Sequence, residues 1–189
     1  MTLYCATGNA GKLREFRLAS SAGIEIEALT GIAAPDETGS MFEENAAEKA
    51  MYYSRFAPGM LFADDSGLEV DALGGAPGIY SARYAGNDAA NNERILREMA
   101  GVSNRKARFV SVIALAEVGR LVRTFRGEVQ GEILHAPQGS GGFGYDPLFW
   151  YPPFGCSLAQ VEAERKQTVS HRGKALAEML AWLQSSGLG

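Results

Sequence analysis

The sequence Leu3-Tyr4-Cys5-Ala6-Thr7-Gly8-Asn9-Ala10-Gly11-Lys12 contains an apolar run, a glycine-bearing turn and a lysine that begins a helical stretch. It is the first of the alternating strand and helix patterns on which the fold assignment rests. Glycines let backbone N–H groups converge, and a helix N-terminus adds partial positive charge to that of the lysine. Residues 7–12 are therefore a candidate phosphate-binding turn, with a plain strand-to-helix connection as the alternative.

This turn is not a Walker A loop. That motif needs a glycine five positions before Gly11, where the chain has Ala6, and serine or threonine after its lysine, where Leu13 stands. The two departures exclude a P-loop kinase.

The composition is that of an ordinary globular domain, with 189 residues, 46% hydrophobic and 21% charged. No apolar run is long enough to cross a bilayer, and no signal-peptide pattern is present, so no membrane partner is expected. Cys5 and Cys156 lie far apart in sequence, which favours reduced thiols and a cytoplasmic protein. The formal net charge of −4 argues against a nucleic-acid partner. Any anionic ligand would need local positive charge or a metal ion.

Strand and helix patterns alternate early in the chain and a hairpin follows later. Ser40-Met41-Phe42-Glu43 fits a capping box that starts a helix running to about Phe56. The strand patterns cover residues 24–29, 60–63, 107–116 and 121–129, the last two forming a predicted hairpin around Gly119. The helical patterns cover residues 12–22, residues 89–99 and a last helix in which Leu176, Met179, Leu180 and Leu183 repeat at helical spacing. This order predicts an α/β protein with a mixed sheet.

Two acidic pairs are candidates for chemistry. Asp64 and Asp65 follow the buried strand 60–63, which we expect to end at them. Adjacent carboxylates repel one another and are costly to desolvate, and Mg²⁺ relieves both problems because it prefers oxygen ligands. The alternative is a turn in which Asp64 or Ser66 bonds the local backbone. The second pair, Asp36-Glu37, has a solvated loop as its alternative.

Two later segments break local rules. In Gly139-Ser140-Gly141-Gly142-Phe143-Gly144-Tyr145-Asp146-Pro147, glycine lets a flat ligand approach the backbone. Phe143 or Tyr145 offers a stacking face and Asp146 an acceptor, unless the aromatic rings simply tuck inward. Ser170-His171-Arg172 comes directly before the last helix, where an arginine opposes the helix dipole unless an anion is nearby. Together with the turn and the carboxylates, these segments indicate a nucleotide site.

Several segments, in order along the chain, also carry a family resemblance. They are Thr7-Gly8-Asn9-Ala10-Gly11-Lys12, Thr38-Gly39 with Phe42-Glu43-Glu44-Asn45-Ala46, Ala63-Asp64-Asp65-Ser66-Gly67-Leu68, Gly74-Gly75-Ala76-Pro77-Gly78-Ile79-Tyr80-Ser81-Ala82-Arg83-Tyr84, Gly141-Gly142-Phe143-Gly144-Tyr145-Asp146-Pro147, and Lys166 with Ser170-His171-Arg172-Gly173. Over nearly its whole length the chain resembles the inosine/xanthosine triphosphate pyrophosphatases, which hydrolyse non-standard purine nucleoside triphosphates to the monophosphate and pyrophosphate.

This resemblance implies a fold, an assembly and a set of site residues. The fold is one domain, residues 1–189, in which a long, bent mixed β-sheet flanked by helices separates two lobes with the active-site cleft between them. The implied assembly is a homodimer. The implied cofactor is Mg²⁺, and the implied substrate is ITP, dITP or XTP. Asp65 is the implied catalytic residue, and the implied metal ligands are Asp65, Asp36 and Glu37. The implied substrate contacts are Thr7, Gly8, Asn9, Ala10, Gly11, Lys12, Ser66, Phe143, Gly144, Tyr145, Asp146, Lys166, His171 and Arg172.

One departure from the family pattern affects the metal site. Many relatives carry Glu-Glu before Thr-Gly, whereas this chain has Asp36-Glu37, so the sequence leaves open which of the two reaches the ion. Two rival functions also stay open at this point. A Maf-type pyrophosphatase would act on modified pyrimidine or methylated nucleotides, and a nucleotide-binding regulator would lack catalysis.

Overall fold

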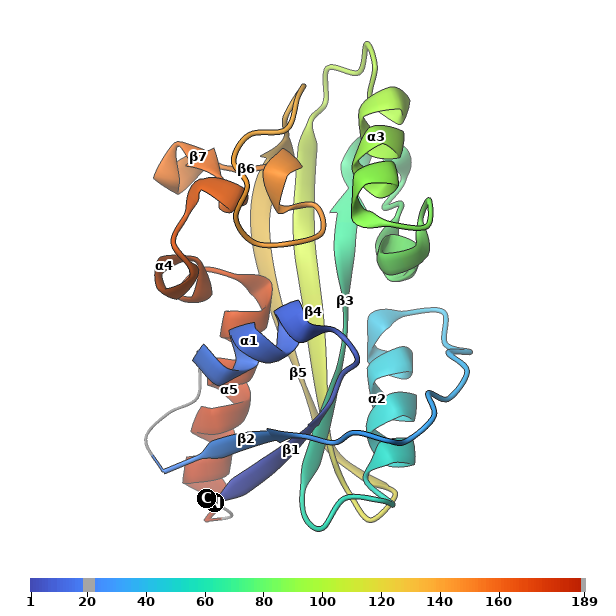
Figure 1. Cartoon of the computed structure of the whole chain (residues 1–189), viewed down its shortest axis with the longest axis vertical. Helices are drawn as coiled ribbons and strands as arrows, with labels where there is room; N and C mark the ends of the chain where they lie inside the picture. Colours follow the sequence, from blue (N-terminus) through green and yellow to red (C-terminus); the bar gives the residue numbers. More distant parts are fainter. Residues whose placement is uncertain (19–22, 188–189) are drawn as a thin grey trace. The chain divides into compact units, whose positions relative to one another are not determined.

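The structure, a computed structural model, describes residues 1–18 and 23–187. Within these residues the strands form one seven-stranded sheet in the order β2-β1-β3-β4-β5-β6-β7 (Figure 1). The strands are β1 (Thr2–Ala6), β2 (Glu25–Ala28), β3 (Leu61–Val70), β4 (Lys106–Glu117), β5 (Arg120–Ile133), β6 (Phe149–Tyr151) and β7 (Cys156–Ser157). The α-helices are α1 (Ala10–Leu18), α2 (Phe42–Tyr53), α3 (Asp88–Glu98), α4 (Ala163–Gln167) and α5 (His171–Ser186).

The sheet is mixed, as the sequence predicts. β1 pairs in parallel with both β2 and β3, with Leu3 opposite Ile26 and Cys5 opposite Phe62. β6 pairs antiparallel with β5 and with β7. Parallel neighbours joined through helices at one edge and antiparallel neighbours at the other confirm the α/β class with a mixed sheet flanked by helices.

The chain divides into two compact units. Unit 1 comprises Met1–Asp65, Ser111–Gly127 and His171–Gly189, and unit 2 comprises Ser66–Val110 and Glu128–Ser170. Three of the boundaries therefore fall inside strands β3, β4 and β5, and the fourth immediately precedes α5. One domain of two lobes stays a prediction.

The core of unit 1 lies between the sheet and the pair of helices α1 and α5. Figure 1 shows these helices on one side of the strands of unit 1 and α2 on the other. Phe16 of α1 meets Phe62 of β3 edge to face, with ring centroids 5.1 Å apart. The predicted stripe on the last helix is confirmed, because its four apolar residues are all buried, namely Leu176, Met179, Leu180 and Leu183. The stripe lies in one core cluster with residues of β1, β3, β4 and β5, and this burial stabilises the helix more than its intrinsic propensity does.

The core of unit 2 is separate. Leu68 and Val70 of β3 pack with Ile95 of α3, and Phe109 of β4 contacts Phe149 of β6 with ring centroids 4.4 Å apart. Gly67 has no room for a side chain, since an added Cβ would lie 2.3 Å from the carbonyl oxygen of Gly78. This close approach positions the segment that follows β3 against the strand.

The expected end of the third strand is wrong. β3 does not stop before Asp64 and Asp65 but continues through both of them to Val70. Leu68 and Val70 are fully buried in unit 2, so packing extends the strand where local turn propensity would end it. The two aspartates therefore lie within a strand and not in a turn.

The predicted capping box at Ser40 is also shifted. α2 begins at Phe42, its N-cap position is Met41, and no side chain caps it. The Ser40 hydroxyl instead donates to Glu44 at 2.9 Å, one residue beyond the glutamate of the predicted box. The helix ends at Tyr53 and not near Phe56.

The predicted hairpin is confirmed. β4 and β5 are neighbours in the sheet and are joined by Val118 and Gly119, whose φ angles are 47° and 77°. Positive φ at both positions is the geometry of a tight two-residue hairpin turn. The end of the predicted helix 12–22 lies partly outside the described residues, because α1 is described only to Leu18. In the part of the chain that the structure describes, no helix combines the length and apolar character that a membrane span requires.

Candidate functional site

The start of α1 and the middle of β3 meet through an ion pair. Lys12, on the first turn of α1, places its Nζ 2.8 Å from Oδ2 of Asp64. The Asp64 side chain is almost fully buried, whereas that of Lys12 keeps 19% of its surface exposed. The lysine is thus held by a carboxylate on one side and reaches solvent on the other.

Asn9 caps the same helix and uses part of the predicted phosphate-binding turn. Its Oδ1 accepts hydrogen bonds from the backbone N–H groups of Gly11 and Lys12, at 2.8 and 3.1 Å. The Thr7 hydroxyl oxygen in turn accepts from the N–H of Asn9 at 3.2 Å. Two of the backbone amides expected to bind an anion therefore already donate to a protein acceptor. The turn can still offer an anion the positive end of the helix and the Lys12 ammonium group.

Asp65 is joined to the segment before α2 through a lysine that the sequence analysis missed. Lys49 of α2 places its Nζ 3.0 Å from Oδ1 of Asp65 and 2.8 Å from Oε1 of Glu37. Asn45, one helical turn earlier, donates from Nδ2 to the other oxygen of Asp65 at 3.2 Å. Both oxygens of the Asp65 carboxylate are thus held from one face of α2.

The two aspartates have opposite pKa shifts. Burial raises the pKa of Asp64, but the positive charges of Lys12, Arg172 and Lys49 outweigh it, so its pKa lies below the usual range. Burial also raises the pKa of Asp65, and there Lys49 and Lys12 do not fully compensate, so the pKa lies above the usual range. Asp65 is therefore the more basic of the two carboxylates.

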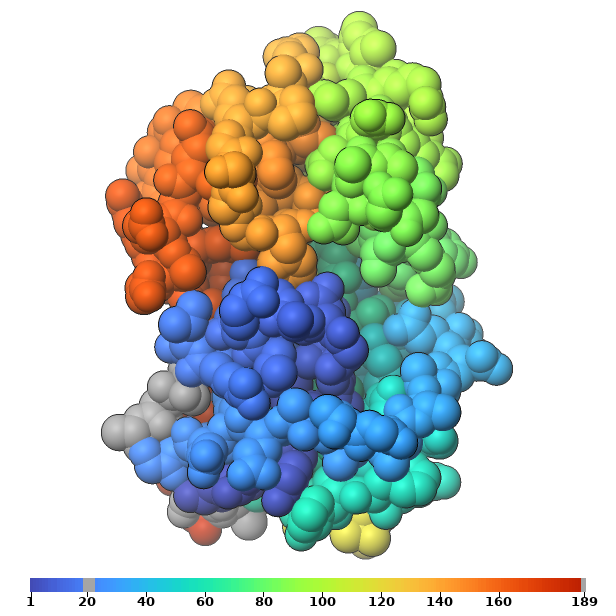
Figure 2. All heavy atoms as spheres, viewed as in Figure 1, coloured from blue at the N-terminus to red at the C-terminus, as the bar shows by residue number. Residues whose placement is uncertain are grey.

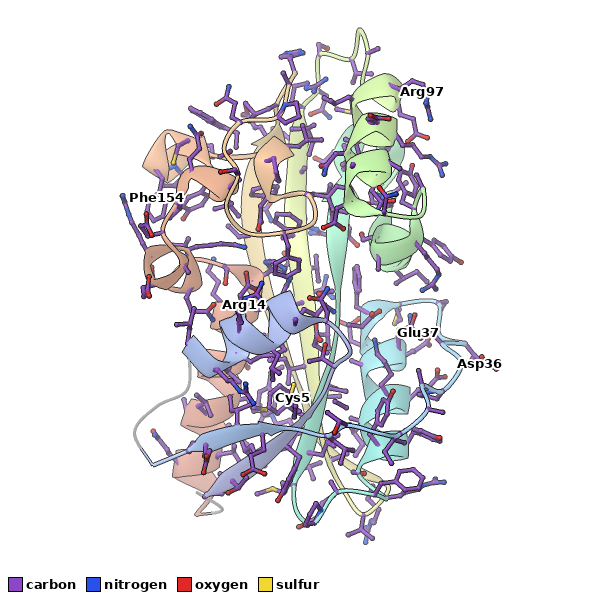
Figure 3. All side chains as sticks on the ribbon, viewed as in Figure 1. Cys5, Arg14, Asp36, Glu37, Arg97 and Phe154 are labelled. Atoms are coloured by element: carbon purple, nitrogen blue, oxygen red, sulfur yellow. The ribbon has the colours of Figure 1, made fainter. Side chains whose placement is uncertain are left out.

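The structure distinguishes Asp36 from Glu37. Asp36 is exposed and points away from α2 in Figure 3, whereas Glu37 lies on the side of the helix and pairs with Lys49. The segment that carries them, residues 29–41, runs over the surface of unit 1 beside α2 (light blue in Figure 2). Of the two, Glu37 is the carboxylate that shares a cation with Asp65.

His171 and Arg172 begin α5 and are both buried. Arg172 Nε lies 2.9 Å from Oε2 of Glu15 on α1, and Arg172 Nη1 contacts Nε2 of His171. An arginine in the first turn of a helix opposes the helix dipole unless an anion lies nearby. Here the carboxylate of Glu15 is that anion. Glu15 was not identified from the sequence.

Unit 2 holds the aromatic segment. Lys166 and Asp146 form a buried ion pair of 2.5 Å, and the Phe143 N–H donates to the same carboxylate at 3.0 Å. Lys166 Nζ lies 5.3 Å from the centre of the Phe143 ring, which is half-buried. The segment thus presents one aromatic ring beside a fixed lysine.

Tyr145 has a structural role in this segment. Its ring is buried in the core of unit 2, and its hydroxyl donates to the carbonyl oxygen of Ser81 at 2.7 Å. Of the two predicted stacking faces, Phe143 is therefore the available one, and the alternative of an inward ring holds for Tyr145. The Gly144 N–H donates to Asp88 at 2.8 Å, and Ser66 is half-buried in β3.

The predicted residues thus fall into two groups. Within unit 1 the structure brings together Lys12 and Asp64, Glu37 and Asp65, and His171 and Arg172. Within unit 2 it brings together Phe143, Asp146 and Lys166. The helical spacing of Phe42, Asn45, Ala46, Lys49 and Ala50 was a signal that could have found Asn45 and Lys49, because it places two polar residues on an otherwise apolar face.

Two carboxylates of unit 1, those of Asp65 and Glu37, are of the oxygen-ligand type that Mg²⁺ prefers. Among residues 1–18 and 23–187, no group of three or more His, Cys, Asp or Glu side chains is arranged to hold a metal ion. Glu37 and Asp65 nevertheless share one cationic group, the Lys49 ammonium. One or two carboxylates with water and substrate phosphates form the usual protein site for this ion.

Comparisons with known proteins match nearly the whole chain. The family model described as the Ham1 family matches residues 3–182. A dITP/XTP pyrophosphatase of Acidobacterium capsulatum is 48% identical over 97% of this chain and 98% of its own. Another of Geobacillus kaustophilus is 49% identical over 94% and 91% of the two chains.

Solved structures agree with the fold. The Ham1 protein of Staphylococcus aureus superposes with a TM-score of 0.87 at 37% identity, covering 98% of this chain and 100% of that one. A nucleoside-triphosphatase, or dITP/XTP pyrophosphatase, of Mycobacterium abscessus has a TM-score of 0.73 at 38% identity, covering 95% of this chain and 99% of that one.

Proposed function

The chain belongs to the Ham1 family, and we propose that it hydrolyses ITP, dITP and XTP to the nucleoside monophosphate and pyrophosphate. The observation that carries this proposal is the buried Asp65 carboxylate of β3, which Lys49 and Asn45 hold. The residue before it in the strand, Asp64, is paired with Lys12. Carboxylates and ammonium groups gathered in this way suit a reaction at a highly charged phosphate. Removing deaminated purines in this way would keep them out of DNA and RNA.

The phosphate chain is assigned to unit 1. Lys12 has an exposed portion of its side chain beside the positive end of α1, where a triphosphate oxygen is favoured. Asn9 and Thr7 hold this turn in shape through their hydrogen bonds to its backbone. We assign the triphosphate to residues 7–12 with Lys12 as the principal charge.

Mg²⁺ would be held by Asp65 and Glu37. When bound, the ion neutralises phosphate charge and orients pyrophosphate as the leaving group. Lys49, which bridges the two carboxylates, supplies a further positive charge for the phosphates. The exposed Asp36 is the weaker candidate ligand.

The reaction requires water to attack the α-phosphorus while the bond to the β-phosphate oxygen breaks. Asp65 accepts the proton that this water loses, a role suited to a carboxyl whose pKa burial has raised. Lys12 and Lys49 stabilise the negative charge that accumulates on the phosphate oxygens in the transition state. Pyrophosphate then leaves with the electron pair of the broken bond.

Within unit 2 we assign the base to Phe143 and Lys166, and within unit 1 His171 and Arg172 remain the candidate hydrogen-bond donors to it. A 6-keto purine presents an acceptor where adenine presents an amino donor, so donors such as Arg172 favour hypoxanthine and xanthine over adenine. Phe143 supplies a ring against which the purine stacks. Asp146 holds Lys166 in place through their buried ion pair.

Pyrophosphate release across standard and deaminated nucleotides, with and without Mg²⁺, tests this proposal. We expect release from ITP, dITP and XTP well above release from ATP, and only with the metal. The Asp65→Asn variant should remain folded and lose Mg²⁺-dependent turnover. Near-normal turnover by this variant would refute the role of Asp65, and preference for modified pyrimidine or methylated nucleotides would favour a Maf-type activity.

We also propose a homodimer in the cytoplasm. Both cysteines are unbridged, with Cys5 buried in β1, as expected for a reducing compartment. Sedimentation velocity of the purified chain tests the assembly, and a single species of 20.2 kDa would contradict it.

A further inference from the structure

Asn45 is the most buried polar side chain on the inner face of α2. Only 1% of its surface is exposed, and its carboxamide makes two hydrogen bonds within unit 1. Nδ2 donates to Oδ2 of Asp65 at 3.2 Å, and Oδ1 accepts from the N–H of Gly39 at 2.9 Å. One neutral side chain thus joins the proposed proton acceptor to the segment that carries Glu37.

The two partners require a carboxamide in one orientation. A backbone N–H can only donate, so it must face Oδ1, and an ionised carboxylate can only accept, so it must face Nδ2. Aspartate of the same shape would keep the first bond and lose the second. A residue with an apolar side chain would lose both and leave buried polar groups without these partners.

Gly39 fits this arrangement from the other side. A Cβ added there would lie 2.6 Å from Oδ1 of Asn45 and 2.9 Å from the Asn45 backbone nitrogen. These distances are too short for any real Cβ, so the backbone reaches the carboxamide only because residue 39 has no side chain. The contact is therefore specified by residues on both of its sides.

Neighbouring bonds fasten the same segment to α2 but do not reach Asp65. Thr38 donates to Glu48 through its N–H and its hydroxyl, at 3.2 and 2.9 Å, and Ser40 donates to Glu44 at 2.7 and 2.9 Å. Lys49 bridges Glu37 and Asp65 by charge. A metal ion between these carboxylates would compete with that ammonium group, whereas it would leave the neutral amide of Asn45 in place.

We propose that Asn45 is a positioning residue that sets the separation of Asp65 and Glu37 for the metal ion. Because these carboxylates are metal ligands only under the function proposed above, this role rests on that function. Asn45 orients Asp65 directly and holds Glu37 through Gly39, two residues further along the chain. Residues that orient metal ligands in this way typically change metal affinity by about 10- to 100-fold when they are removed.

Two variants, Asn45→Ala and Gly39→Ala, test the role from opposite sides of the contact. For each, the Mg²⁺ concentration at half-maximal pyrophosphate release from ITP should rise about tenfold or more, while KM for ITP at saturating Mg²⁺ changes less than about threefold. The double variant should be little worse than Gly39→Ala alone, since Gly39→Ala already displaces the carboxamide that Asn45→Ala removes. The control Ser40→Ala loses an exposed hydrogen bond of the same segment and should keep the wild-type Mg²⁺ requirement.

A second readout needs neither metal nor nucleotide. Hydrogen exchange of the Gly39 amide, followed by NMR on the apoenzyme, should be about tenfold faster or more in Asn45→Ala than in wild type. Unchanged exchange, or an unchanged Mg²⁺ requirement in both folded single variants, would overturn the role of Asn45. If wild type releases no pyrophosphate from ITP, dITP or XTP, the proposed function itself is overturned, whatever the exchange rates show.

Discussion

The ion pair between Glu15 and Arg172 provides the sharpest test of how unit 1 is stabilised. Their side chains are 12% and 7% exposed, and Nε of Arg172 lies 2.9 Å from Oε2 of Glu15. The Glu15→Gln variant keeps the volume of the side chain and removes its charge. Arg172 then remains buried without the carboxylate that faces it.

Removing one partner of a buried pair typically costs about 3–5 kcal/mol. Arg172 also interacts with the charge of Asp64, whose pKa it helps to lower, so part of its compensation survives. We therefore expect a loss of about 2–3 kcal/mol in the free energy of unfolding. For a chain of this length that corresponds to a fall of about 5–10 °C in Tm.

The assay is urea and thermal unfolding of wild type, Glu15→Gln, Arg172→Met and the double variant. The coupling energy from this cycle should exceed about 1 kcal/mol. The control is Glu43→Gln, the same chemical change at an exposed pair in which Glu43 Oε1 lies 2.5 Å from Arg126 Nη1. It should cost under about 1 kcal/mol. Equal losses from Glu15→Gln and Glu43→Gln would refute the argument that burial, and not proximity alone, makes the first pair strong.

Three further predictions concern the turn before α1, the buried thiol and the hairpin. Lys12→Met should raise KM for ITP about 10- to 100-fold, the effect of losing one charge-assisted hydrogen bond. An unchanged KM would refute the assignment of the triphosphate to residues 7–12. Burial raises the pKa of Cys5 above its ordinary value near 9, so its contribution to stability is complete below that pH and declines as the pH rises beyond it. Urea unfolding at pH 8 and pH 10 should therefore show a smaller alkaline loss for Cys5→Ala than for wild type, and equal losses would contradict the shift. Gly119→Ala should cost about 1–3 kcal/mol, because φ is +77° and the new Cβ would lie 2.9 Å from Nε of Arg55. Gly101→Ala, with φ of +73° and open space around the Cβ, should cost less, and equal costs would show that the contact with Arg55 is unimportant.

Much of the architecture was predictable from local patterns. The stripe on α5, the β4–β5 hairpin and the strand, turn and helix at the start of the chain each depend on residues close together in sequence. Such patterns predict elements well because hydrophobic periodicity and turn chemistry act locally. The end of β3 was missed because Leu68 and Val70 extend the strand by packing in unit 2, an effect that turn-forming residues at 64–67 conceal.

The candidate site was only partly predictable. Lys12, Asp65 and Glu37 stand out as charged residues in recognisable segments, but the choice between Asp36 and Glu37 depends on which of them faces Lys49. Asn45 and Lys49 had a signal in their helical spacing on an otherwise apolar face of α2. Glu15 gave none, because a buried polar residue on an amphipathic helix looks like an ordinary helix residue in a sequence. The role of each of these three residues is defined only by the groups that it contacts in the folded protein.

The sequence by itself determined the α/β class, the kinds of charged group available and the order in which they occur. Only the tertiary structure decided which charges are neutralised and which are left for chemistry. Asp64 and Asp65 are adjacent and chemically identical, yet Lys12 and Arg172 lower the pKa of one while burial raises that of the other. The physical reason is that a pKa depends on solvent exclusion and on charges brought near by folding, and those charges come from positions as distant in sequence as residues 12 and 172.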